Sequence, residues 1–243
     1  MTTLIVGASG ATGKHLVEQL LKKGQKVKVI VRTAENLPNS WKKNDKVSII
    51  IANASEIGVD DMVSHLVGCD AAASCLGHNI SFKGMFGKPR RLVTDTVRTI
   101  CNAIKKNGAG EKPIKFVLMN TSGNSNRDLT ETISMGEKIV IGLLRLLLPP
   151  HVDNEKAADY LRTKVGQKDK FIEWVAVRPD GLVNEDEVTE YEAFPSPTRS
   201  AIFNAGTISR INVGNFMADL IVDDNLWNKW KGQMPILYNK ANQ

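Results

Sequence analysis

The sequence contains few cysteines, no cluster of basic residues and no long hydrophobic run. Its three cysteines form no Cys-x-x-Cys pair, so we expect reduced thiols rather than a disulfide framework or a zinc site. The lysines and arginines behind the net charge of +6 are spread along the chain, which does not indicate nucleic-acid binding. The most apolar run, residues 139–148, is shorter than the roughly 20 residues that span a bilayer, so we expect no membrane partner.

Signals for several other classes of protein are also missing. The first predicted strand begins at Thr3, so we expect no targeting segment before it and predict a cytoplasmic protein. No spacing of histidine and acidic residues indicates a metal site, and no Gly-x-Ser-x-Gly motif indicates a hydrolase. With 243 residues, 42% hydrophobic and 24% charged, the chain is long enough for one large α/β domain.

The most informative motif that is present lies at the N-terminus. A strand-like segment is followed by the loop Gly-Ala-Ser-Gly-Ala-Thr-Gly at residues 7–13 and then by an amphipathic helical pattern. The unpaired N–H groups and partial positive charge of a helix N-terminus bind a pyrophosphate. Gly7 allows the tight turn, Gly10 lets phosphates approach the main chain, and Gly13 lets the helix pack on the strand. The motif therefore predicts a dinucleotide site formed by Gly7, Ser9, Gly10, Ala11, Thr12 and Gly13; the alternative is an ordinary strand–helix turn.

The end of the next predicted strand, residues 27–31, indicates which dinucleotide is bound. NAD sites usually place an Asp or Glu about twenty residues beyond the glycine loop, where it accepts hydrogen bonds from the ribose 2′-OH. This chain has Arg32 at that place, and a guanidinium pairs with a 2′-phosphate instead. We therefore predict NADP(H) as the cofactor; the alternative is a solvent-facing arginine at a strand end.

Apolar strand-like runs alternate with helical patterns through most of the chain. This alternation predicts a parallel α/β sheet covered by helices on both faces. We interpret residues 1–243 as a single NAD(P)-binding domain. Three insertions, near residues 78–88, 129–150 and 184–209, follow the carboxyl ends of predicted strands, where open α/β sheets bind their ligands. The first of them carries Phe82, Met85 and Phe86, which would suit a flat aromatic substrate.

Further motifs follow the glycine loop and Arg32 in order along the chain. They are Leu37-Pro38, Asp70 leading to Leu76-Gly77, Thr121-Ser122, Lys156 and Arg178-Pro179. Together these motifs resemble the atypical short-chain dehydrogenase/reductases, in their NAD(P)H-binding, NmrA-like branch, and within it the biliverdin-IXβ/flavin reductases. The resemblance implies a Rossmann-type doubly wound sheet of about seven mainly parallel strands, with NADP(H) along their carboxyl edge.

The resemblance also implies site residues beyond the glycine loop. Relatives usually carry Gly-Asp after the third strand, where the aspartate contacts adenine. Here Ala52-Asn53 stands at that place, so the amide of Asn53 would contact the adenine. The cofactor-binding residues implied in this way are Arg32, Asn53, Ala54, Leu76, Gly77, Ser122, Lys156 and Pro179.

A catalytic tyrosine is not expected. Tyr160-x-x-x-Lys164 has the spelling of the pair that many short-chain dehydrogenases use to protonate a carbonyl. Atypical relatives, however, typically read Lys-x-x-Ala-Glu-x-x-Leu-Arg at this helix, and residues 156–162 read Lys-Ala-Ala-Asp-Tyr-Leu-Arg. In that register Lys156 binds the nicotinamide ribose, and the tyrosine position falls at Val152, which cannot transfer a proton.

These features predict an NADPH-dependent oxidoreductase that reduces a flavin, quinone or similar ring acceptor by direct hydride transfer. Such acceptors take their proton from solvent, so a tyrosine acid is dispensable. The predicted catalytic residues are Lys156 and Ser122, whose hydroxyl would orient a substrate oxygen, while His78 and His151 are candidates for substrate contact. One alternative is a non-catalytic NADP(H)-sensing regulatory protein of the NmrA-like type, and another is a carbonyl reductase that uses Tyr160.

Residues 139–148 are apolar on nearly every side, which is too much for a half-exposed surface helix. Such a segment is either a buried helix or a cover over a substrate site or a partner. We expect it to close over the nicotinamide end of the cleft and to contact a second chain in a homodimer. The other expected partner is a small ring-type substrate.

Overall fold

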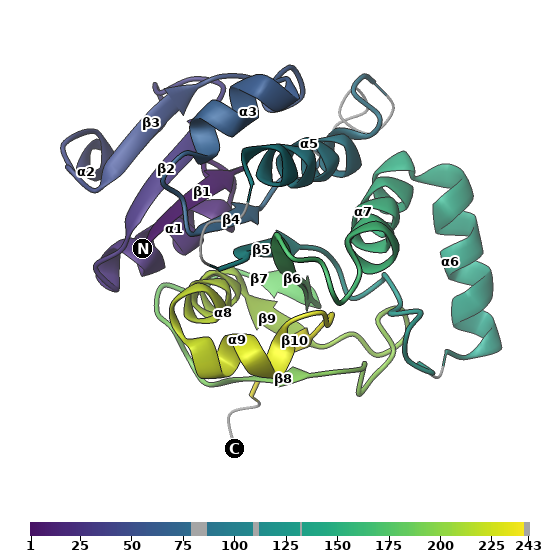
Figure 1. Ribbon diagram of the computed structural model, residues 1–243. Coiled ribbons are helices and arrows are strands. Elements are labelled where there is room, and N and C mark those ends of the chain that lie inside the picture. Colours follow the sequence, from purple (N-terminus) through teal and green to yellow (C-terminus); the bar gives the residue numbers. More distant parts are fainter. Residues whose placement is uncertain (79–86, 109–111, 132, 241–243) are drawn as a thin grey trace.

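The computed structural model describes residues 1–78, 87–108, 112–131 and 133–240, and these form a central sheet of eight strands (Figure 1). The strand order is β3-β2-β1-β4-β5-β6-β10-β8. All neighbours are parallel except β8, which pairs antiparallel with β10 at one edge. The strands are β1 (Thr2–Val6), β2 (Lys26–Val31), β3 (Val47–Ile51), β4 (Ala71–Ser74), β5 (Ile114–Met119), β6 (Ile172–Pro179), β8 (Tyr191–Phe194) and β10 (Ile236–Asn239). The predicted Rossmann-type fold, with seven parallel strands, is confirmed.

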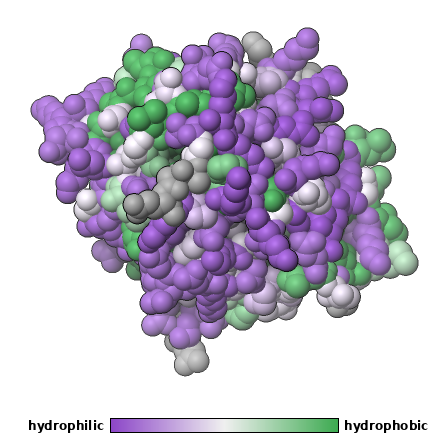
Figure 2. Space-filling model, viewed as in Figure 1, coloured by the Kyte–Doolittle hydropathy of each residue, from purple (hydrophilic) through white to green (hydrophobic). Residues whose placement is uncertain are grey.

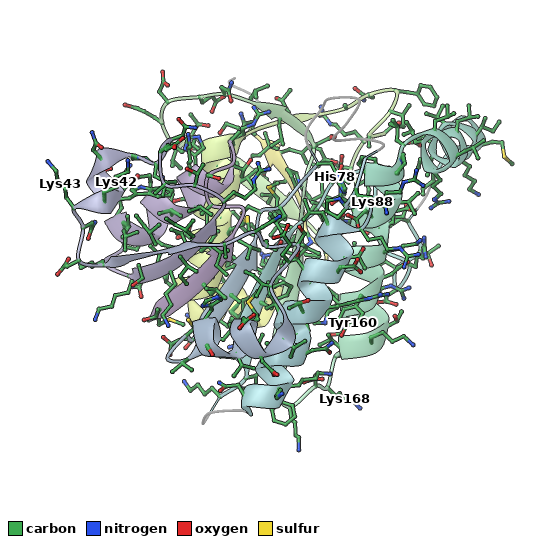
Figure 3. The ribbon with its side chains drawn as sticks, turned by 90° about the horizontal axis from the view of Figure 1, so that it is seen from above. Lys42, Lys43, His78, Lys88, Tyr160 and Lys168 are labelled. Atoms are coloured by element: carbon green, nitrogen blue, oxygen red, sulfur yellow. The ribbon has the colours of Figure 1, made fainter. Side chains whose placement is uncertain are left out.

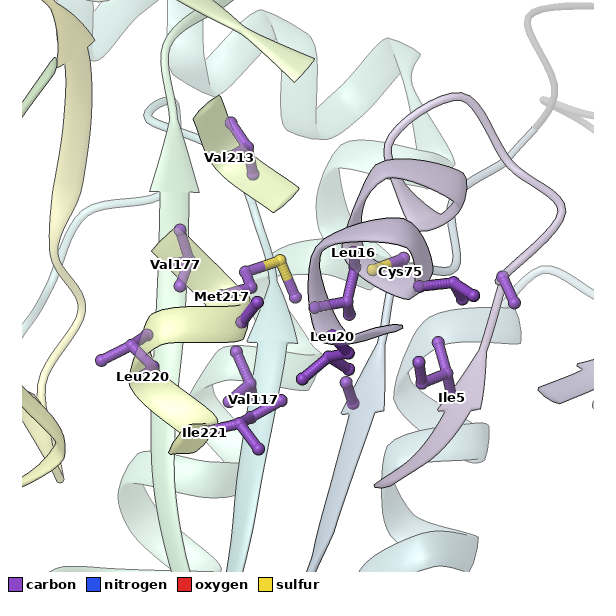
Figure 4. Packing of buried hydrophobic residues seen from close by; sticks show 14 of the residues in the cluster. Ile5, Leu16, Leu20, Cys75, Val117, Val177, Val213, Met217, Leu220 and Ile221 are labelled. Atoms are coloured by element: carbon purple, nitrogen blue, oxygen red, sulfur yellow. The ribbon is translucent and has the colours of Figure 1, made fainter. Parts of the chain in front are cut away.

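Helices cover both faces of the sheet, because successive side chains of a strand point to opposite faces. In β1, Ile5 belongs to one hydrophobic core, whereas Leu4 and Val6 belong to the other. Figure 4 shows Ile5 on the first face with side chains such as Leu20 and Met217. That face is covered by α1 (Gly13–Lys22), α8 (Arg210–Val222) and α9 (Asp224–Trp230), and α2 (Asn39–Lys42) adds its Trp41. The other face is covered by α3 (Val59–Leu66), α5 (Leu92–Asn107), α7 (Pro149–Tyr160) and the π-helical turn η1 (Leu161–Val165).

The predicted insertions contain the expected apolar helix and, in addition, strands that the sequence pattern did not show. Residues 79–86, with Phe82, Met85 and Phe86, lie outside the described residues. The insertion at 129–150 holds α6 (Met135–Leu147). The insertion at 184–209 supplies β8 to the main sheet and β9 (Thr207–Ser209), which pairs with β7 (Gly181–Val183). The polar composition of this segment concealed β8, because an edge strand needs only one apolar face.

The apolar helix α6 is mostly exposed rather than buried. It packs against α7 on the side away from the sheet (Figure 1), and within it only Ile141 is buried. Its first turn contacts the insertion at 184–209, where Ser200 Oγ donates a hydrogen bond to Glu137 Oε1 at 2.6 Å. The expectation that this helix closes over the nicotinamide end stays a prediction. No helix in the described part of the chain has the length and apolarity to cross a membrane.

Polar side chains hold α6 on α7. Arg145 donates hydrogen bonds to the Glu155 carboxylate at 2.8 and 2.9 Å, and His151 Nε2 lies 3.4 Å from the same group. Burial by itself would raise the pKa of Glu155, but the hydrogen bonds from His151 and Arg145 outweigh it and lower this pKa to about 2. Glu155 therefore remains ionised well into the acid range and keeps the two helices together.

Replacing Glu155 should reduce stability at neutral pH but not in strong acid. A pKa lowered from 4.5 to about 2 in the folded state stabilises the fold above pH 4.5, and this stabilisation is lost as the pH falls through 2. We expect Glu155→Gln to lower the free energy of unfolding by roughly 3 kcal/mol at pH 7, with a deficit that shrinks steadily below pH 4.5. Urea unfolding at pH 7, 4 and 3 measures the deficit, with Glu192→Gln as an exposed control. A deficit that does not change with pH would contradict the assignment.

Candidate functional site

A cleft of about 450 Å³ runs along the carboxyl ends of β1 to β4. The chain turns from β1 to β2 and β3 on one side and returns to β4 on the other, so the cleft lies where the strand order reverses. Eight of the predicted cofactor-binding residues line it: Gly7, Ser9, Gly10, Arg32, Asn53, Ala54, Leu76 and Gly77. Residues from four separate strand ends are therefore brought together as the sequence pattern predicted.

The glycines of the loop have different physical roles. Gly7 has φ +76°, and a Cβ on it would lie 2.6 Å from the carbonyl group of Cys75, the residue that directly follows β4. A Cβ on Gly13 would lie 2.1 Å from the Gly7 oxygen, so only glycine lets α1 begin this close to β1. Gly10 is less crowded, with 3.2 Å to the nearest atom, and it lines the cleft. Two glycines thus allow packing, while the third leaves open space for a ligand.

The N-terminus of α1 has the features of an anion-binding site. Thr12 precedes the helix without a side-chain capping hydrogen bond, and the first turn carries no acidic residue. Lys14 N already donates to the Gly10 oxygen at 3.1 Å, so the other N–H groups of the first turn would face a ligand, and the helix dipole adds partial positive charge. Thr12 and Gly13 are buried in the turn, while Ala11 is exposed. None of these three is among the cleft-lining residues, but their backbone forms the helix start beside the loop, so the chain fits a pyrophosphate here.

The charged side chains that line the cleft are cationic. Among the described lining residues none is acidic, whereas Arg32 and Lys88 both face it. Arg32 is exposed directly after β2 and forms no ion pair with the described part of the chain. Lys88 was not predicted, because it lies at the end of the insertion after β4 and belongs to no motif. This lining fits a ligand with several phosphates better than one that offers only hydroxyls.

Asn53 lies in the cleft, but its amide is already engaged. Its Nδ2 donates to Glu56 Oε1 at 2.7 Å, and its Oδ1 accepts from the Ser55 hydroxyl at 2.9 Å. These bonds fix the turn between β3 and α3, as Asn side chains often do. Contact with an adenine by this amide would require the turn to exchange these bonds.

Ser122, Lys156 and Pro179 lie outside the lining of this cleft. Ser122 and Pro179 are neighbours at the ends of β5 and β6, where Ser122 N donates to the Pro179 oxygen at 3.0 Å. Ser122 Oγ donates to Asp180 Oδ1 at 2.8 Å, and the other carboxylate oxygen of Asp180 accepts from Gly206 N at 2.7 Å. The carboxylate of Asp180, which the sequence did not single out, therefore holds the Ser122 hydroxyl in place.

Lys156 is exposed on α7 and makes no hydrogen bond or ion pair with the described residues. Its helix lies beside the end of β5, because Asn120 Nδ2 donates to the Asn154 oxygen at 2.9 Å. Its predicted role toward the nicotinamide ribose stays a prediction.

Tyr160 lies far from the cleft. Its hydroxyl is 3.5 Å from Asn102 Oδ1 on α5. Asn102 follows Leu92, a residue that lines the cleft, by ten residues, which is about 15 Å along this helix. Nearby Asp169 accepts a hydrogen bond from Ile172 N at the beginning of β6, which places Tyr160 toward the amino edge of the sheet. Figure 3 shows the same separation: His78 and Lys88 lie together near the cleft, and Tyr160 lies away from them toward the opposite edge of the sheet. Burial also raises the pKa of the Tyr160 hydroxyl, which disfavours a catalytic acid–base role.

His78 lines the cleft and belongs to a buried polar network. Its Nε2 lies 2.8 Å from Asp153 Oδ2, and the Asp153 side chain is almost fully buried. The same carboxylate accepts hydrogen bonds from Val93 N and Thr94 N at 2.8 and 3.0 Å, so it caps the start of α5. Asp153 therefore connects α7, α5 and the wall of the cleft. Because His78 and Asp153 are 75 positions apart in the sequence, no local pattern predicts this contact. His151, the other predicted histidine, faces Glu155 instead.

A buried arginine joins the loops beyond β5 and β8 to the sheet. Arg178, in β6, is fully buried and donates two hydrogen bonds to the Glu131 carboxylate, at 2.7 and 3.1 Å. It also donates to the carbonyl oxygens of Asn124, Met234 and Pro195 at 2.9, 2.6 and 3.2 Å. Because the guanidinium has no further hydrogen to donate, its position is fixed by all of these loops together.

Removing the arginine should destabilise the chain strongly. Arg178→Met leaves the Glu131 carboxylate buried without its partner, which costs about 3–5 kcal/mol in the free energy of unfolding. Urea unfolding measures the loss, and the double variant Arg178→Met/Glu131→Gln should recover part of it. Lys231→Met, which removes a more exposed ion pair with Glu173, is the control and should change stability far less. An Arg178→Met chain as stable as the wild type would show that the pair does not hold these loops.

The comparisons with known proteins agree with this geometry. The NAD(P)H-binding family matches residues 7–224, a span that begins at the first glycine of the loop. An uncharacterized chloroplastic protein of Arabidopsis thaliana is 26% identical over 225 residues, which cover 90% of this chain and 71% of that protein.

Solved structures share the fold over the whole chain. A wide-type short-chain dehydrogenase/reductase from Veillonella parvula, in complex with NADP, is 15% identical with a TM-score of 0.71, covering 99% of this chain and 95% of that one. ChuY, an anaerobillin reductase from Escherichia coli O157:H7, is 16% identical with a TM-score of 0.66, covering 100% of this chain and 99% of that one. At these identities the likeness shows the fold alone.

Proposed function

The chain belongs to the NAD(P)H-binding family, and we propose that it is an NADPH-dependent reductase of a flavin, quinone or similar ring acceptor. The observation that carries the proposal is the cleft at the glycine loop, where Arg32 and Lys88 are present and no described lining residue is acidic. A site selective for NADH would need a carboxylate to accept hydrogen bonds from the ribose 2′-OH. A 2′-phosphate instead needs cationic donors, which Arg32 supplies at the end of β2.

Different residues along the strand ends would bind different parts of NADPH and of the acceptor. The backbone of Gly7 to Gly13 and the start of α1 would hold the pyrophosphate, and Arg32 the 2′-phosphate. Bound NADPH would supply the hydride. Ser122, held by Asp180, would orient a polar atom of the acceptor beyond the carboxyl ends of β5 and β6.

The placement of Tyr160 supports a ring acceptor over a simple carbonyl. A carbonyl needs a positioned acid when hydride arrives, and the tyrosine in the expected spelling is at the wrong edge of the sheet. Flavins and quinones take their proton from solvent, so positioning and a hydride donor suffice. ChuY, which shares this fold, is an anaerobillin reductase, so the fold is compatible with a reductase.

The alternative is a non-catalytic NADP(H) sensor that binds a regulatory partner. The exposed position of Lys156 favours it, because this residue makes no hydrogen bond or ion pair with the described residues that would hold it toward a nicotinamide ribose. Such a protein would bind the cofactor through the same cleft without turnover.

Arg32→Ala should weaken the binding of NADPH while leaving NADH nearly unchanged. A hydrogen bond to a charged group contributes roughly 1.5–3 kcal/mol, which corresponds to about a ten- to hundredfold loss of affinity. Isothermal titration with each cofactor measures it, and Lys43→Ala, an exposed lysine outside the cleft lining, is the matched control. Equal losses for both cofactors would remove the 2′-phosphate assignment.

Oxidation of NADPH in the presence of a panel of flavins and quinones separates the reductase from the sensor. Turnover above the enzyme-free rate supports the reductase, and it should persist in Tyr160→Phe while Ser122→Ala lowers it. Tight NADPH binding with no turnover on any acceptor would favour the sensor. Loss of activity in Tyr160→Phe would instead favour a carbonyl reductase.

A further inference from the structure

Helix α6 carries an unusual concentration of exposed apolar side chains. Of the eleven large hydrophobic residues that are exposed in the described part of the chain, five lie on this helix. A sixth, Phe203, lies beside it, because a Cβ placed on Gly136 would be 3.3 Å from the Phe203 ring. We call this surface the α6 patch; it consists of Met135, Ile139, Leu143, Leu146, Leu147 and Phe203.

The patch forms one continuous stripe. Met135, Ile139 and Leu143 are spaced by four residues, and Leu146 follows after three, which places them on one side of a helix about 20 Å long. Figure 2 shows green, hydrophobic atoms at the right edge of the molecule, where Figure 1 places α6. The stripe contains no charged residue, because those of α6 lie on its other sides.

The area of the patch exceeds what a monomer usually exposes. Its side chains are 51–78% exposed. With about 200 Å² for each large apolar side chain, this corresponds to roughly 700 Å² on one molecule. The largest patch on a typical monomer is about 300–600 Å², whereas a standard interface buries about 800 Å² on each partner. The patch alone therefore nearly supplies one side of a stable interface.

The chemistry of the helix points to a second copy of this chain as the partner. In a two-fold symmetric interface each residue meets the same surface of the other copy, so a stripe without charge is compatible with itself. A helix that lies on an anionic membrane needs a polar face rich in lysine and arginine. In α6, Arg145 is paired with Glu155 and Glu137 binds Ser200, which leaves only Lys138 for lipid phosphates.

We propose that two copies of this chain associate through the α6 patch, with their α6 helices antiparallel across a two-fold axis. The middle of the stripe is near Gly142 and Leu143, so the axis passes there and Ile139 of one copy faces Leu146 of the other. A Cβ placed on Gly142 meets no atom within 4 Å, so this glycine lies open and lets the two helices approach closely. The dimer also fixes the first turn of α6, which contacts Ser200 in the insertion at 184–209.

A charge in the stripe should separate the copies. We expect the wild type to have the mass of two chains in light scattering at micromolar concentration, and Leu146→Asp to have the mass of one, with a dimer Kd raised at least about a hundredfold. Val67→Asp replaces a comparably exposed hydrophobic residue after α3 and should leave the dimer intact. NADPH affinity, measured in parallel, should be unchanged in both variants and reports that the fold persists.

A cross-link tests the geometry without disrupting the stripe. Leu143→Cys, close to the proposed axis, should form a disulfide between two copies when an oxidant such as diamide is added, whereas Val67→Cys should not. The native cysteines Cys69, Cys75 and Cys101 are buried and do not compete.

Three results would overturn the proposal. The first is a wild type that is a monomer at all concentrations up to 100 µM. The second is a dimer that Leu146→Asp leaves intact. The third is a monomer that binds vesicles of anionic phospholipid through the same patch, with binding lost in Leu146→Asp, which would make the membrane the occupant.

Discussion

The close approach of α1 to the ends of β1 and β4 is the constraint on which the cofactor cleft depends. A Cβ on Gly13 would overlap the Gly7 oxygen, and a Cβ on Gly7 would overlap the main chain at Cys75. These contacts set the position of the helix N-terminus relative to the sheet. The parallel register of β1, β2 and β3 then brings Arg32 and Asn53 to the same edge as the loop. The half of the site nearest the glycine loop is thus formed by backbone packing between neighbouring strands.

The other half depends on buried polar side chains. Arg178 holds the loops beyond β5 and β8 through Glu131 and carbonyl oxygens, and Asp180 holds the Ser122 hydroxyl. Asp153 joins the wall of the cleft at His78 to the start of α5. Buried ionic groups are costly unless every donor and acceptor is matched, so these networks fix one arrangement of long loops that have few apolar contacts of their own.

The helix α6 shows what a hydrophobic pattern leaves undecided. The apolar character of residues 139–148 rightly indicated an unusual helix, but the hydrophobic pattern does not say what lies opposite each face. In the structure, α7 and the Arg145–Glu155 contact occupy one side of α6 and leave the apolar stripe exposed. A segment that is too apolar for a surface and yet lies on the surface is best explained by association between molecules.

The sequence by itself determined the parallel sheet and the cofactor cleft, because both rest on local signals. Apolar runs mark buried strands, glycines mark the phosphate loop, and Arg32 follows its strand directly, so neighbours along the chain carry the information. Only the tertiary structure decided the partners of His78, Ser122 and Arg178, the contribution of Lys88, and the edge strand β8. It also placed the Tyr160 hydroxyl beside Asn102 and away from the cleft. The physical reason is that hydrogen bonds and ion pairs between side chains 47 to 75 positions apart leave no periodic pattern in the chain, whereas burial of a strand or a helix face does.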